Sequence, residues 1–324
     1  MKKLVSVVSI VLILCMLFSF AGCKAPEKAS ITVAALKGPT GVGMVNLMNE
    51  NKNGTALNNY SFTVAGDVTE ISGKIVTGEI NIASVPTNFA AKINQKTENG
   101  MVMLAVNTLG VLSIVEKGNT VTQVADLKGK TIYSTGEGSN PEYILKYVLR
   151  QNNIDPDKDV TIKFVGTGDE LTAKIVSGEA EVAMVPEPAA TVALNKNKEY
   201  TRVLNMTEEW NKIGNGSQLM MGCVIAKKSF VEENKKAVEN FLKDYEKSIK
   251  AVSENADTTA ALCEENGIIP SAAIAKKALP NCNVTYVTGN EMKNKIGGYF
   301  EVLYNADKTS IGAIPSADFY YNAK

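Results

Sequence analysis

Small polar side chains directly follow two β-branched segments of the chain, and hydrogen bonding to a small molecule is the chemistry they could perform. Thr87 and Asn88 follow one segment, and Glu187 follows the other between two prolines. A hydroxyl or an amide could donate to or accept from a solute, whereas the carboxylate could accept from an amine or a ring N–H. We therefore expect ligand contacts from all three residues; for Glu187, a plain surface carboxylate is the alternative.

Two glycine-rich loops, at 38–43 and 136–140, place backbone N–H groups at predicted helix starts. Such groups suit an anionic or carbonyl oxygen, although glycine there could simply permit a tight turn. Neither loop matches the phosphate-binding pattern GxxxxGK followed by Ser or Thr. The candidate ligand contacts in and around these loops are Lys37, Gly38, Thr40, Gly41, Ser134, Ser139 and Asn140.

The composition excludes several classes of protein. The chain contains no histidine, which excludes a Ser-His-Asp triad, a Cys-His pair and any zinc site that uses histidine. We expect no catalytic residue, no metal and no cofactor. Lys+Arg and Asp+Glu both number 34, so the chain lacks the basic character of a nucleic-acid binder. The only arginines, Arg150 and Arg202, lie outside the predicted loops, which disfavours a ligand carboxylate held by a guanidinium fork.

Cysteine and aromatic residues carry weaker signals. Cys223, Cys263 and Cys282 are odd in number and lack metal-type spacing, so we expect buried free thiols, with a Cys263–Cys282 disulfide left open. Trp210 and Tyr133 could stack on a ligand. The helical setting of Trp210 favours packing in the protein interior instead.

The N-terminus is typical of an export signal. A basic start precedes an uncharged, mostly apolar run at 4–20, and Ala21, Gly22 and Cys23 follow. These residues resemble the bacterial lipoprotein cleavage box, which implies lipidation of Cys23; an uncleaved membrane span is the alternative. We predict a signal peptide at 1–22, a tether at 23–30 and a folded part anchored to the cell membrane on its extracytoplasmic face.

An internal repeat predicts the architecture. Residues 70–90 and 170–190 share ten of 21 positions at a constant offset of 100. Each copy predicts a short helix, closed by Gly78 or Gly178, and then a strand that a proline ends. Further strands and glycine loops precede both copies. This alternation predicts an α/β fold of two lobes, each a mainly parallel sheet flanked by helices.

The repeat also predicts how the lobes are arranged. We expect residues 31–107 and 218–324 to form lobe 1 and residues 108–217 to form lobe 2. In parallel α/β sheets, ligands lie beyond the carboxyl ends of the strands. The loop at Thr87 and Asn88 should therefore face the loop at Glu187 and Pro188 across a cleft. The candidates for the back wall of the cleft are Asn107, Thr108 and Ser217.

Seven segments, in order, resemble the extracytoplasmic substrate-binding proteins of ABC importers, in the nitrate, sulfonate, taurine and thiamine-precursor group. They are the lipoprotein start, KGPTGVG at 37–43, GEINIASVPTN at 78–88, AVNTLG at 105–110, ADLKGKTI at 125–132, GEAEVAMVPEPA at 178–189 and TEEWNK at 207–212. The resemblance implies a type II periplasmic-binding-protein fold that closes on one solute and presents it to a permease.

The resulting hypothesis is a lipid-anchored, monomeric protein that captures a small solute by hinge closure and delivers it to ABC permease and ATPase subunits. The solute would be an oxyanion, a sulfonate or a pyrimidine-like compound, and no nucleic acid is involved. An enzyme on the same two-lobed fold, of dehydratase or pyrimidine-precursor type, is one alternative, and a sensory lipoprotein is another. The lack of histidine and of a nucleophile–base pair disfavours the enzyme.

Overall fold

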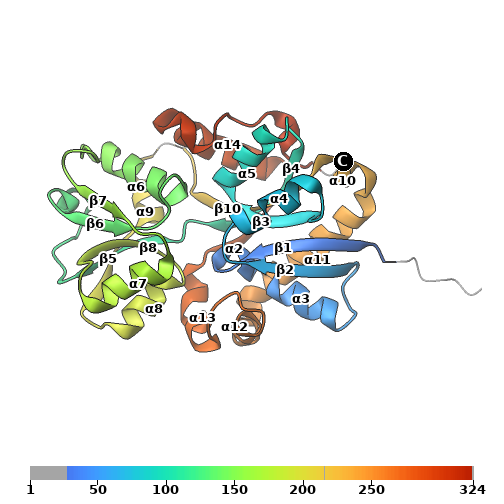
Figure 1. Ribbon diagram of the computed structural model, residues 1–324, viewed down its shortest axis with the longest axis horizontal. Helices are drawn as coiled ribbons and strands as arrows, with labels where there is room; N and C mark the ends of the chain where they lie inside the picture. The colour runs from blue at the N-terminus through green and yellow to red at the C-terminus, as the bar shows by residue number, and fades with distance from the viewer. Residues whose placement is uncertain (1–27, 215, 323–324) are drawn as a thin grey trace, which may run out of the picture.

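The computed structural model describes residues 28–214 and 216–322, so the predicted signal peptide and Cys23 lie outside the described residues. Two α/β lobes lie side by side, each built on its own sheet with helices on both faces (Figure 1). This arrangement confirms the predicted two-lobed α/β fold. Within the described ranges, no helix combines the length and the apolar character that a membrane span needs.

The larger sheet has six strands in the order β11-β4-β10-β3-β1-β2. Its strands are β1 (Ser30–Leu36), β2 (Asn59–Ala65), β3 (Ile82–Pro86), β4 (Met101–Leu109), β10 (Met220–Lys227) and β11 (Val284–Val287). The helices of this lobe are α2 (Pro39–Val42), α3 (Val45–Lys52), α4 (Thr69–Thr77), α5 (Thr87–Lys96), α10 (Lys228–Glu233), α11 (Lys235–Glu254), α12 (Ala256–Glu265), α13 (Ala272–Ala278) and α14 (Gly289–Ala306). Short 3-10 turns η2 (Leu279–Asn281), η3 (Lys308–Ser310) and η4 (Ala317–Phe319) complete it.

The smaller sheet has five strands in the order β7-β6-β8-β5-β9. They are β5 (Leu112–Lys117), β6 (Thr131–Ser134), β7 (Thr161–Phe164), β8 (Val182–Pro186) and β9 (Tyr200–Asn205). The helices of this lobe are η1 (Val124–Leu127), α6 (Asn140–Gln151), α7 (Gly168–Ser177), α8 (Ala189–Lys196) and α9 (Met206–Lys212).

Both sheets are mixed, whereas the sequence predicted mainly parallel sheets. β1 pairs in parallel with β2 and β3, and β6 pairs in parallel with β7 and β8. The strands next to the crossings run the other way: β5 is antiparallel to β8, and β10 is antiparallel to β3 and β4. β10 reverses because it brings the chain back beside β4, the strand along which the chain left the lobe. β4 itself continues to Leu109, two residues past the predicted lobe boundary.

The internal repeat is one structural unit present twice, with β3 in the larger sheet and β8 in the smaller one. Gly78 and Gly178 end α4 and α7 at φ values of 88° and 86°, where a side chain would strain the backbone. Thr167 caps α7, because its hydroxyl accepts a hydrogen bond from the Glu170 N–H at 3.1 Å. The predicted glycine caps at the C-termini of both helices are therefore confirmed.

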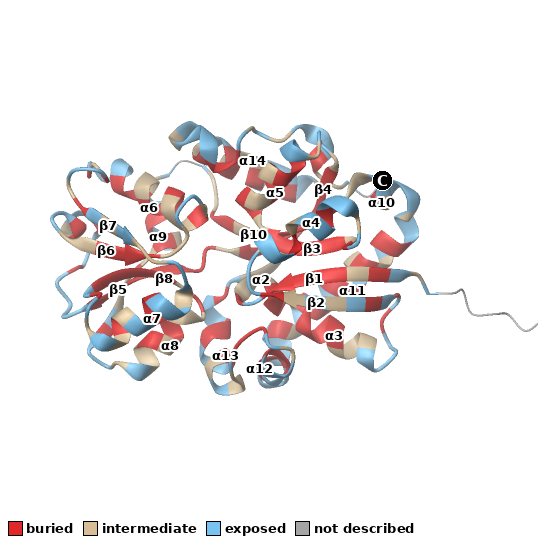
Figure 2. Ribbon diagram, viewed as in Figure 1, coloured by how far each residue is buried: buried red, intermediate tan, exposed pale blue. Residues whose placement is uncertain are grey.

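The hydrophobic core of each lobe lies against both faces of its sheet, and the central strands are buried (Figure 2). Residues 101–108 of β4 are all buried, whereas the edge strand β2 alternates exposed positions with buried or partly buried ones. Trp210 is fully buried, and its ring lies 4.8 Å from the Tyr147 ring and 5.6 Å from the Tyr299 ring. Because Tyr299 belongs to α14, this tryptophan packs one lobe against the other.

The three described cysteines, Cys223, Cys263 and Cys282, are free and buried, so the disulfide left open by the sequence is not formed. Burial raises the pKa of each thiol above its usual value. A raised pKa keeps these thiols protonated and unreactive at neutral pH.

Candidate functional site

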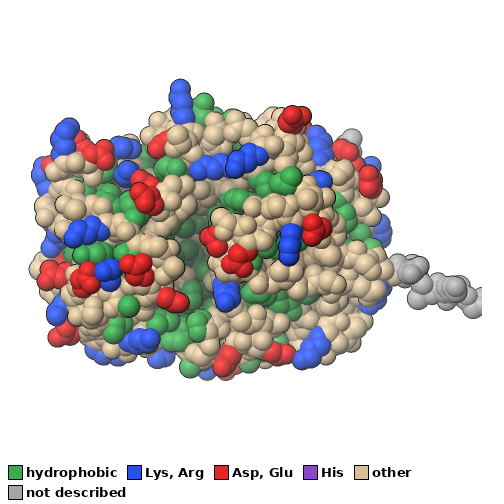
Figure 3. All heavy atoms as spheres, in the orientation of Figure 1, with side chains coloured by type: hydrophobic (Ala, Val, Ile, Leu, Met, Phe, Trp, Pro, Cys, Tyr) green, Lys and Arg blue, Asp and Glu red, His purple; other side chains and the backbone are tan. Residues whose placement is uncertain are grey.

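A cavity of about 1130 Å³ lies between the two lobes, in the hollow that separates the two halves of the molecule in Figure 3. Leu36 at the end of β1, Pro86 at the end of β3 and Pro186 at the end of β8 all border it. This is the edge of the sheets at which α/β proteins bind ligands. Hydrophobic side chains form part of its wall, namely Phe89, Val111, Val192, Met221, Ile268 and Ile274.

The cavity brings together most of the residues that the sequence predicted as ligand contacts. Eight of the predicted residues line it: Lys37, Gly38, Thr40, Asn88, Thr108, Ser139, Asn140 and Glu187. The loops of the two lobes approach closely, because a Cβ built on Gly38 would lie 3.8 Å from Pro188 Cδ.

Five predicted contacts do not line the cavity within the described part of the chain: Gly41, Thr87, Asn107, Ser134 and Ser217. Gly41 serves the tight turn that was its alternative interpretation, since a Cβ there would lie 2.0 Å from the carbonyl oxygen of Leu36. The Ser134 hydroxyl donates to the Thr135 carbonyl at 3.1 Å. The Ser217 hydroxyl accepts from the Trp210 indole N–H at 3.1 Å.

Asn107 holds the first glycine loop in place through hydrogen bonds of its buried side chain. Its amide nitrogen, with two hydrogens to donate, lies 3.0 Å from the Thr40 carbonyl, 2.7 Å from the Ser84 hydroxyl and 2.9 Å from the Tyr245 hydroxyl. The side chain is 1% exposed, so these bonds are shielded from water. Asn107 therefore supports a residue that lines the cavity and does not itself line it.

Thr87 connects the lobes. Its hydroxyl donates to the Met220 carbonyl at 2.7 Å and accepts from the Asn140 amide nitrogen of α6 at 3.3 Å. The Asn140 amide nitrogen also lies 3.3 Å from the Met221 carbonyl. Since Asn140 belongs to the smaller lobe and Thr87 and Met221 belong to the larger one, the two contacts of the Asn140 amide nitrogen link the lobes.

Two side chains at the cavity have polar atoms without partners. Asn88 is 4% exposed, and its side chain makes no hydrogen bond within the described part of the chain. Asn140 is 2% exposed, and its amide oxygen is unpaired while its amide nitrogen is engaged. A buried polar atom without a partner costs about 1–3 kcal/mol. Such atoms are rare in folded proteins, and each calls for an explanation such as a functional role or a bound water or ion.

Glu187 lines the cavity with its carboxylate already engaged. One carboxylate oxygen lies 2.5 Å from the Arg202 guanidinium, and the other accepts from the Thr191 hydroxyl at 2.7 Å. The sequence analysis did not place Arg202 near the site. Only the pairing of β9 with β5, and of β5 with β8, brings Arg202 to Glu187.

The glycine loops have fewer free N–H groups than the sequence suggested. In the first loop, the Gly38 N–H donates to the Ile268 carbonyl at 2.8 Å, and the Gly41 N–H donates to the Gly38 carbonyl at 3.0 Å. In the second, the Gly138 N–H donates to the Glu142 carboxylate at 2.6 Å. These N–H groups are therefore occupied by acceptors of the chain itself.

Lys92 is a cavity residue that the sequence analysis missed. Its ammonium lies 3.4 Å from the Gly138 carbonyl and 5.8 Å from the Tyr143 ring centre, both in the other lobe. Burial lowers the pKa of Lys92, while the Asp307 carboxylate opposes this effect. Its spacing of four from Asn88 in a helix places both residues on one face, and that signal was available in the sequence.

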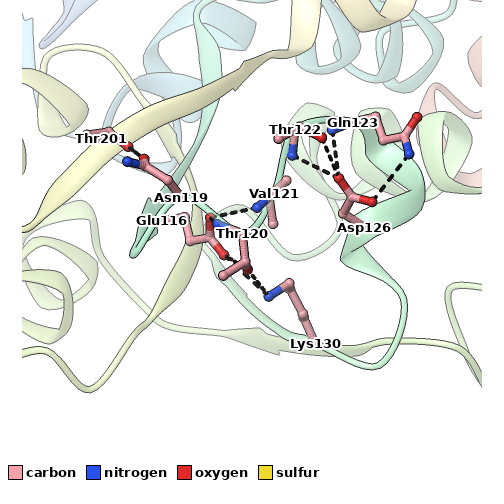
Figure 4. A network of polar contacts seen from close by, with 9 residues as sticks. All are labelled: Glu116, Asn119, Thr120, Val121, Thr122, Gln123, Asp126, Lys130 and Thr201. Atoms are coloured by element: carbon pink, nitrogen blue, oxygen red, sulfur yellow. Dashed lines mark hydrogen bonds and ion pairs between the residues drawn. The ribbon is translucent and has the colours of Figure 1, made fainter.

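Other charged clusters lie away from the cavity. In lobe 2, Glu116 accepts from the Thr120 N–H at 2.7 Å and the Val121 N–H at 2.8 Å, and it lies 3.3 Å from the Lys130 ammonium (Figure 4). None of these residues lines the cavity. Among the described residues, no group of three or more cysteine, aspartate and glutamate side chains could hold a metal ion.

Comparison with known proteins identifies the family. A family model described as "ABC transporter, phosphonate, periplasmic substrate-binding protein" matches residues 54–272. The chain belongs to this family. The resemblance to ABC substrate-binding proteins is thereby confirmed, and the chain is the substrate-binding component of an ABC importer for a small solute. No curated protein matches it.

Solved structures of substrate-binding proteins share the fold. An ABC transporter structure from Parabacteroides distasonis has a TM-score of 0.77 at 20% identity, covering 92% of this chain and 100% of the other. The aliphatic sulphonate binding protein SsuA of Escherichia coli has a TM-score of 0.69 at 17% identity, with coverages of 91% and 96%. The nitrate-binding protein NrtA of Synechocystis has a TM-score of 0.58 at 15% identity, with coverages of 79% and 70%.

Proposed function

We propose that this family member captures its solute between the lobes by hinge closure and passes it to the permease and ATPase subunits without changing it chemically. The observation that carries this proposal is the cavity lined by both lobes, at which the buried Asn88 and Asn140 have unpaired polar atoms. A solute that contacts both lobes binds the closed form more tightly than the open form. It therefore shifts the population toward closure.

Hinge motion is supported by the chain path. The chain crosses between the lobes after β4 and returns before β10, and these two strands pair side by side. The cross-lobe hydrogen bonds of Asn140 to Thr87 and to Met221 are 3.3 Å long, so they are long enough to yield readily. Rotation about two adjacent strands would open the cavity and leave both sheets intact.

Binding without catalysis is supported by the groups at the cavity. The chain contains no histidine. The Ser139 hydroxyl donates to the Gly136 carbonyl at 2.7 Å, and Glu187 is paired with Arg202. An activated nucleophile needs an adjacent general base, which Ser139 does not have.

We also propose that the protein is a monomer held on the extracytoplasmic face of the membrane through a lipid on Cys23. Cys23 follows two small residues, which themselves follow an apolar run, as in lipoprotein signals. Metabolic labelling with radioactive palmitate should label the full chain, and a Cys23→Ser variant should remain unlabelled. Equal labelling of both would contradict this assignment.

The proposed capture is tested with the full chain purified in detergent. The protein is incubated with a cell extract, washed and denatured, and the released small molecules are identified by mass spectrometry. We expect one solute to be enriched and recovered unchanged, and we expect the purified solute to reduce the radius of gyration in X-ray scattering.

Two tryptophan substitutions provide a matched control. Val192→Trp should block capture, because residue 192 lines the cavity. Val76→Trp should leave capture intact, because Val76 is 43% exposed and does not line the cavity. Equal enrichment by both variants, or recovery of a chemically altered solute, would contradict the proposed function.

A further inference from the structure

Lys92 differs from the other two lysines that line the cavity. Lys37 and Lys196 are exposed, whereas Lys92 is partly buried. The Lys92 ammonium has three hydrogens to donate, yet within the described part of the chain it makes one hydrogen bond, to the Gly138 carbonyl at 3.4 Å, and no ion pair. The Tyr143 ring, whose centre lies 5.8 Å away, is uncharged as well. This partly buried cation therefore has no carboxylate as a partner.

Closure of the lobes is what buries the Lys92 ammonium. Lys92 belongs to α5 of the larger lobe, whereas Gly138 and Tyr143 belong to the smaller lobe. When the lobes part, these neighbours move away and water takes their place. Burial lowers the pKa of Lys92, while the Asp307 carboxylate opposes this effect and the Lys96 ammonium adds to it. Closure of an empty cavity thus removes water from a cation and supplies no anion in return.

The helix that carries Lys92 also lacks a carboxylate at its start. The other helices of eight or more residues that begin at the cavity are α4, α6, α7 and α8, and backbone N–H groups at their starts donate to the carboxylates of Glu70, Glu142, Glu170 and Glu187, respectively. A carboxylate in this place offsets the positive end of the helix dipole. The first turn of α5 contains no acidic residue.

Asn88 adds a donor at the start of α5. The residue is 4% exposed, and its side chain makes no hydrogen bond within the described ranges. Its amide oxygen is buried, whereas its amide nitrogen keeps accessible surface. Asn88 and Lys92 are four residues apart, so they lie on one face of α5, and both line the cavity. An oxyanionic group at this face would accept from the amide and from the ammonium, and charge-assisted hydrogen bonds are about twice as strong as neutral ones.

We propose that Lys92 makes closure of the lobes depend on the charge of the solute. In the empty protein, burial of the unpaired ammonium disfavours the closed form. An oxyanionic group bound between Asn88 and Lys92 supplies the missing partner, so the population shifts toward closure, whereas a neutral solute leaves the ammonium unpaired. Lys92 is thus a specificity-determining residue, and this inference rests on the proposed function.

The first test needs no solute. Small-angle neutron scattering of the full chain, in contrast-matched detergent, gives the radius of gyration of the unliganded protein. Lys92→Met removes the charge and keeps a side chain of similar length, so we expect a smaller radius than in the natural protein. Lys92→Arg keeps the charge and should match the natural protein. An unchanged or larger radius in Lys92→Met overturns the inference, because loss of a residue that merely links the lobes would leave them more open.

Lys96→Met is the matched control. Lys96 lies one turn further along α5, is exposed and does not line the cavity, so its substitution removes the same charge from the same helix. The radius of gyration should stay that of the natural protein, and urea unfolding of each variant checks that the fold is retained. An equal decrease in Lys96→Met and Lys92→Met would show that the effect is not local to Lys92, which counts against the inference.

The second test compares two solutes of similar shape and different charge. Ethanesulfonate is an anion, and ethanesulfonamide is its neutral counterpart. By titration calorimetry, we expect the natural protein to bind the anion more tightly, and we expect Lys92→Met to reduce the ratio of the two affinities by about tenfold or more. An unchanged ratio in Lys92→Met overturns the inference and leaves the proposed capture function standing.

If neither compound binds, the solute captured from cell extract decides. A captured oxyanion supports the inference when its affinity falls in Lys92→Met and not in Lys96→Met, and it overturns the inference when Lys92→Met binds it as well as the natural protein does. A captured solute without an anionic group overturns the inference alone. Capture of nothing by the natural protein overturns the proposed function together with it.

Discussion

The two loops that follow β3 and β8 occupy equivalent places in the repeat but differ in how their polar groups are used. After β3, the Thr87 hydroxyl is engaged by the Met220 carbonyl, while the Asn88 side chain has no hydrogen bond. After β8, the Glu187 carboxylate is held by Arg202 and Thr191. The same backbone unit thus presents a free carboxamide in lobe 1 and a fully paired carboxylate in lobe 2.

This difference indicates that the loop after β3 binds the solute, whereas the loop after β8 stabilises the fold. A side chain with unpaired polar atoms at a cavity costs the protein stability unless a ligand supplies the partner. A buried ion pair with additional hydrogen bonds needs no ligand and holds its loop in place. We therefore expect substitutions after β8 to affect folding and substitutions after β3 to affect binding.

The largest effect is expected from breaking the ion pair in lobe 2. Arg202→Met should lower the free energy of unfolding by about 3 kcal/mol, because it leaves the Glu187 carboxylate buried without its cation. The double variant Arg202→Met, Glu187→Met should recover much of that loss, since the buried charge is gone. Urea denaturation measures both, and a double variant no more stable than the single one would show that the pair is not what stabilises the loop.

A smaller effect, and of a different kind, is expected in lobe 1. Asn88→Leu should lower the affinity for the captured solute by about tenfold to a hundredfold, while the free energy of unfolding changes by less than about 1 kcal/mol. Removing an unpaired polar group costs the folded protein little. Titration calorimetry and urea denaturation give the two numbers, and a large stability loss at unchanged affinity would reverse the comparison.

Thr87 should affect both stability and lobe closure, because its hydroxyl bonds within the larger lobe and also to Asn140 of the smaller lobe. Thr87→Val removes the hydrogen bond to the Met220 carbonyl and the acceptor for Asn140, and it should cost about 1 kcal/mol of stability. Scattering of the unliganded protein should also show a larger radius of gyration. Thr63→Val, an exposed position in β2, is the matched control and should change neither quantity.

The smallest effect is expected at Glu116, whose carboxylate is paired away from the cavity. Its burial favours the neutral form, but hydrogen bonds from Thr120, Val121 and Lys130 outweigh this, and the pKa of Glu116 is lowered. A lowered pKa means that Glu116 contributes stability above its unfolded-state pKa and loses it as the pH falls through its folded-state pKa.

Glu116→Gln should therefore flatten the loss of stability on the acid side, measured by thermal unfolding between neutral and acidic pH, and should leave solute affinity unchanged. A variant with the same acid profile as the natural protein would show that the hydrogen bonds to Glu116 do not carry this pH dependence.

Local sequence signals predicted the repeated unit well because they depend on short-range geometry. The ends of α4 and α7 follow from glycines at 78 and 178, which adopt a left-handed backbone that other residues avoid. The strand ends at Pro86 and Pro186 follow from the missing N–H of proline. The mixed order of the sheets had no local signal, since it depends on which segments pair across the chain.

The candidate site was predicted as a region more reliably than as a set of residues. Asn88 and Asn140 line the cavity. Asn107 has the same side chain, but its amide nitrogen is hydrogen-bonded to the hydroxyl of Tyr245, 138 residues further along the chain. No pattern near Asn107 reveals that partner. The exact lobe boundaries and the ligand contacts themselves stay predictions.

The sequence by itself determined the class of fold, the family resemblance and the edge of the sheets at which a ligand would lie, because helix caps, strand ends and an internal repeat are encoded within a few residues of one another. Only the tertiary structure decided which polar groups remain free for a solute. Hydrogen-bond partners such as Arg202 for Glu187 and Met220 for Thr87 come from distant segments. A side chain is available to a ligand only when no such segment folds back to satisfy it.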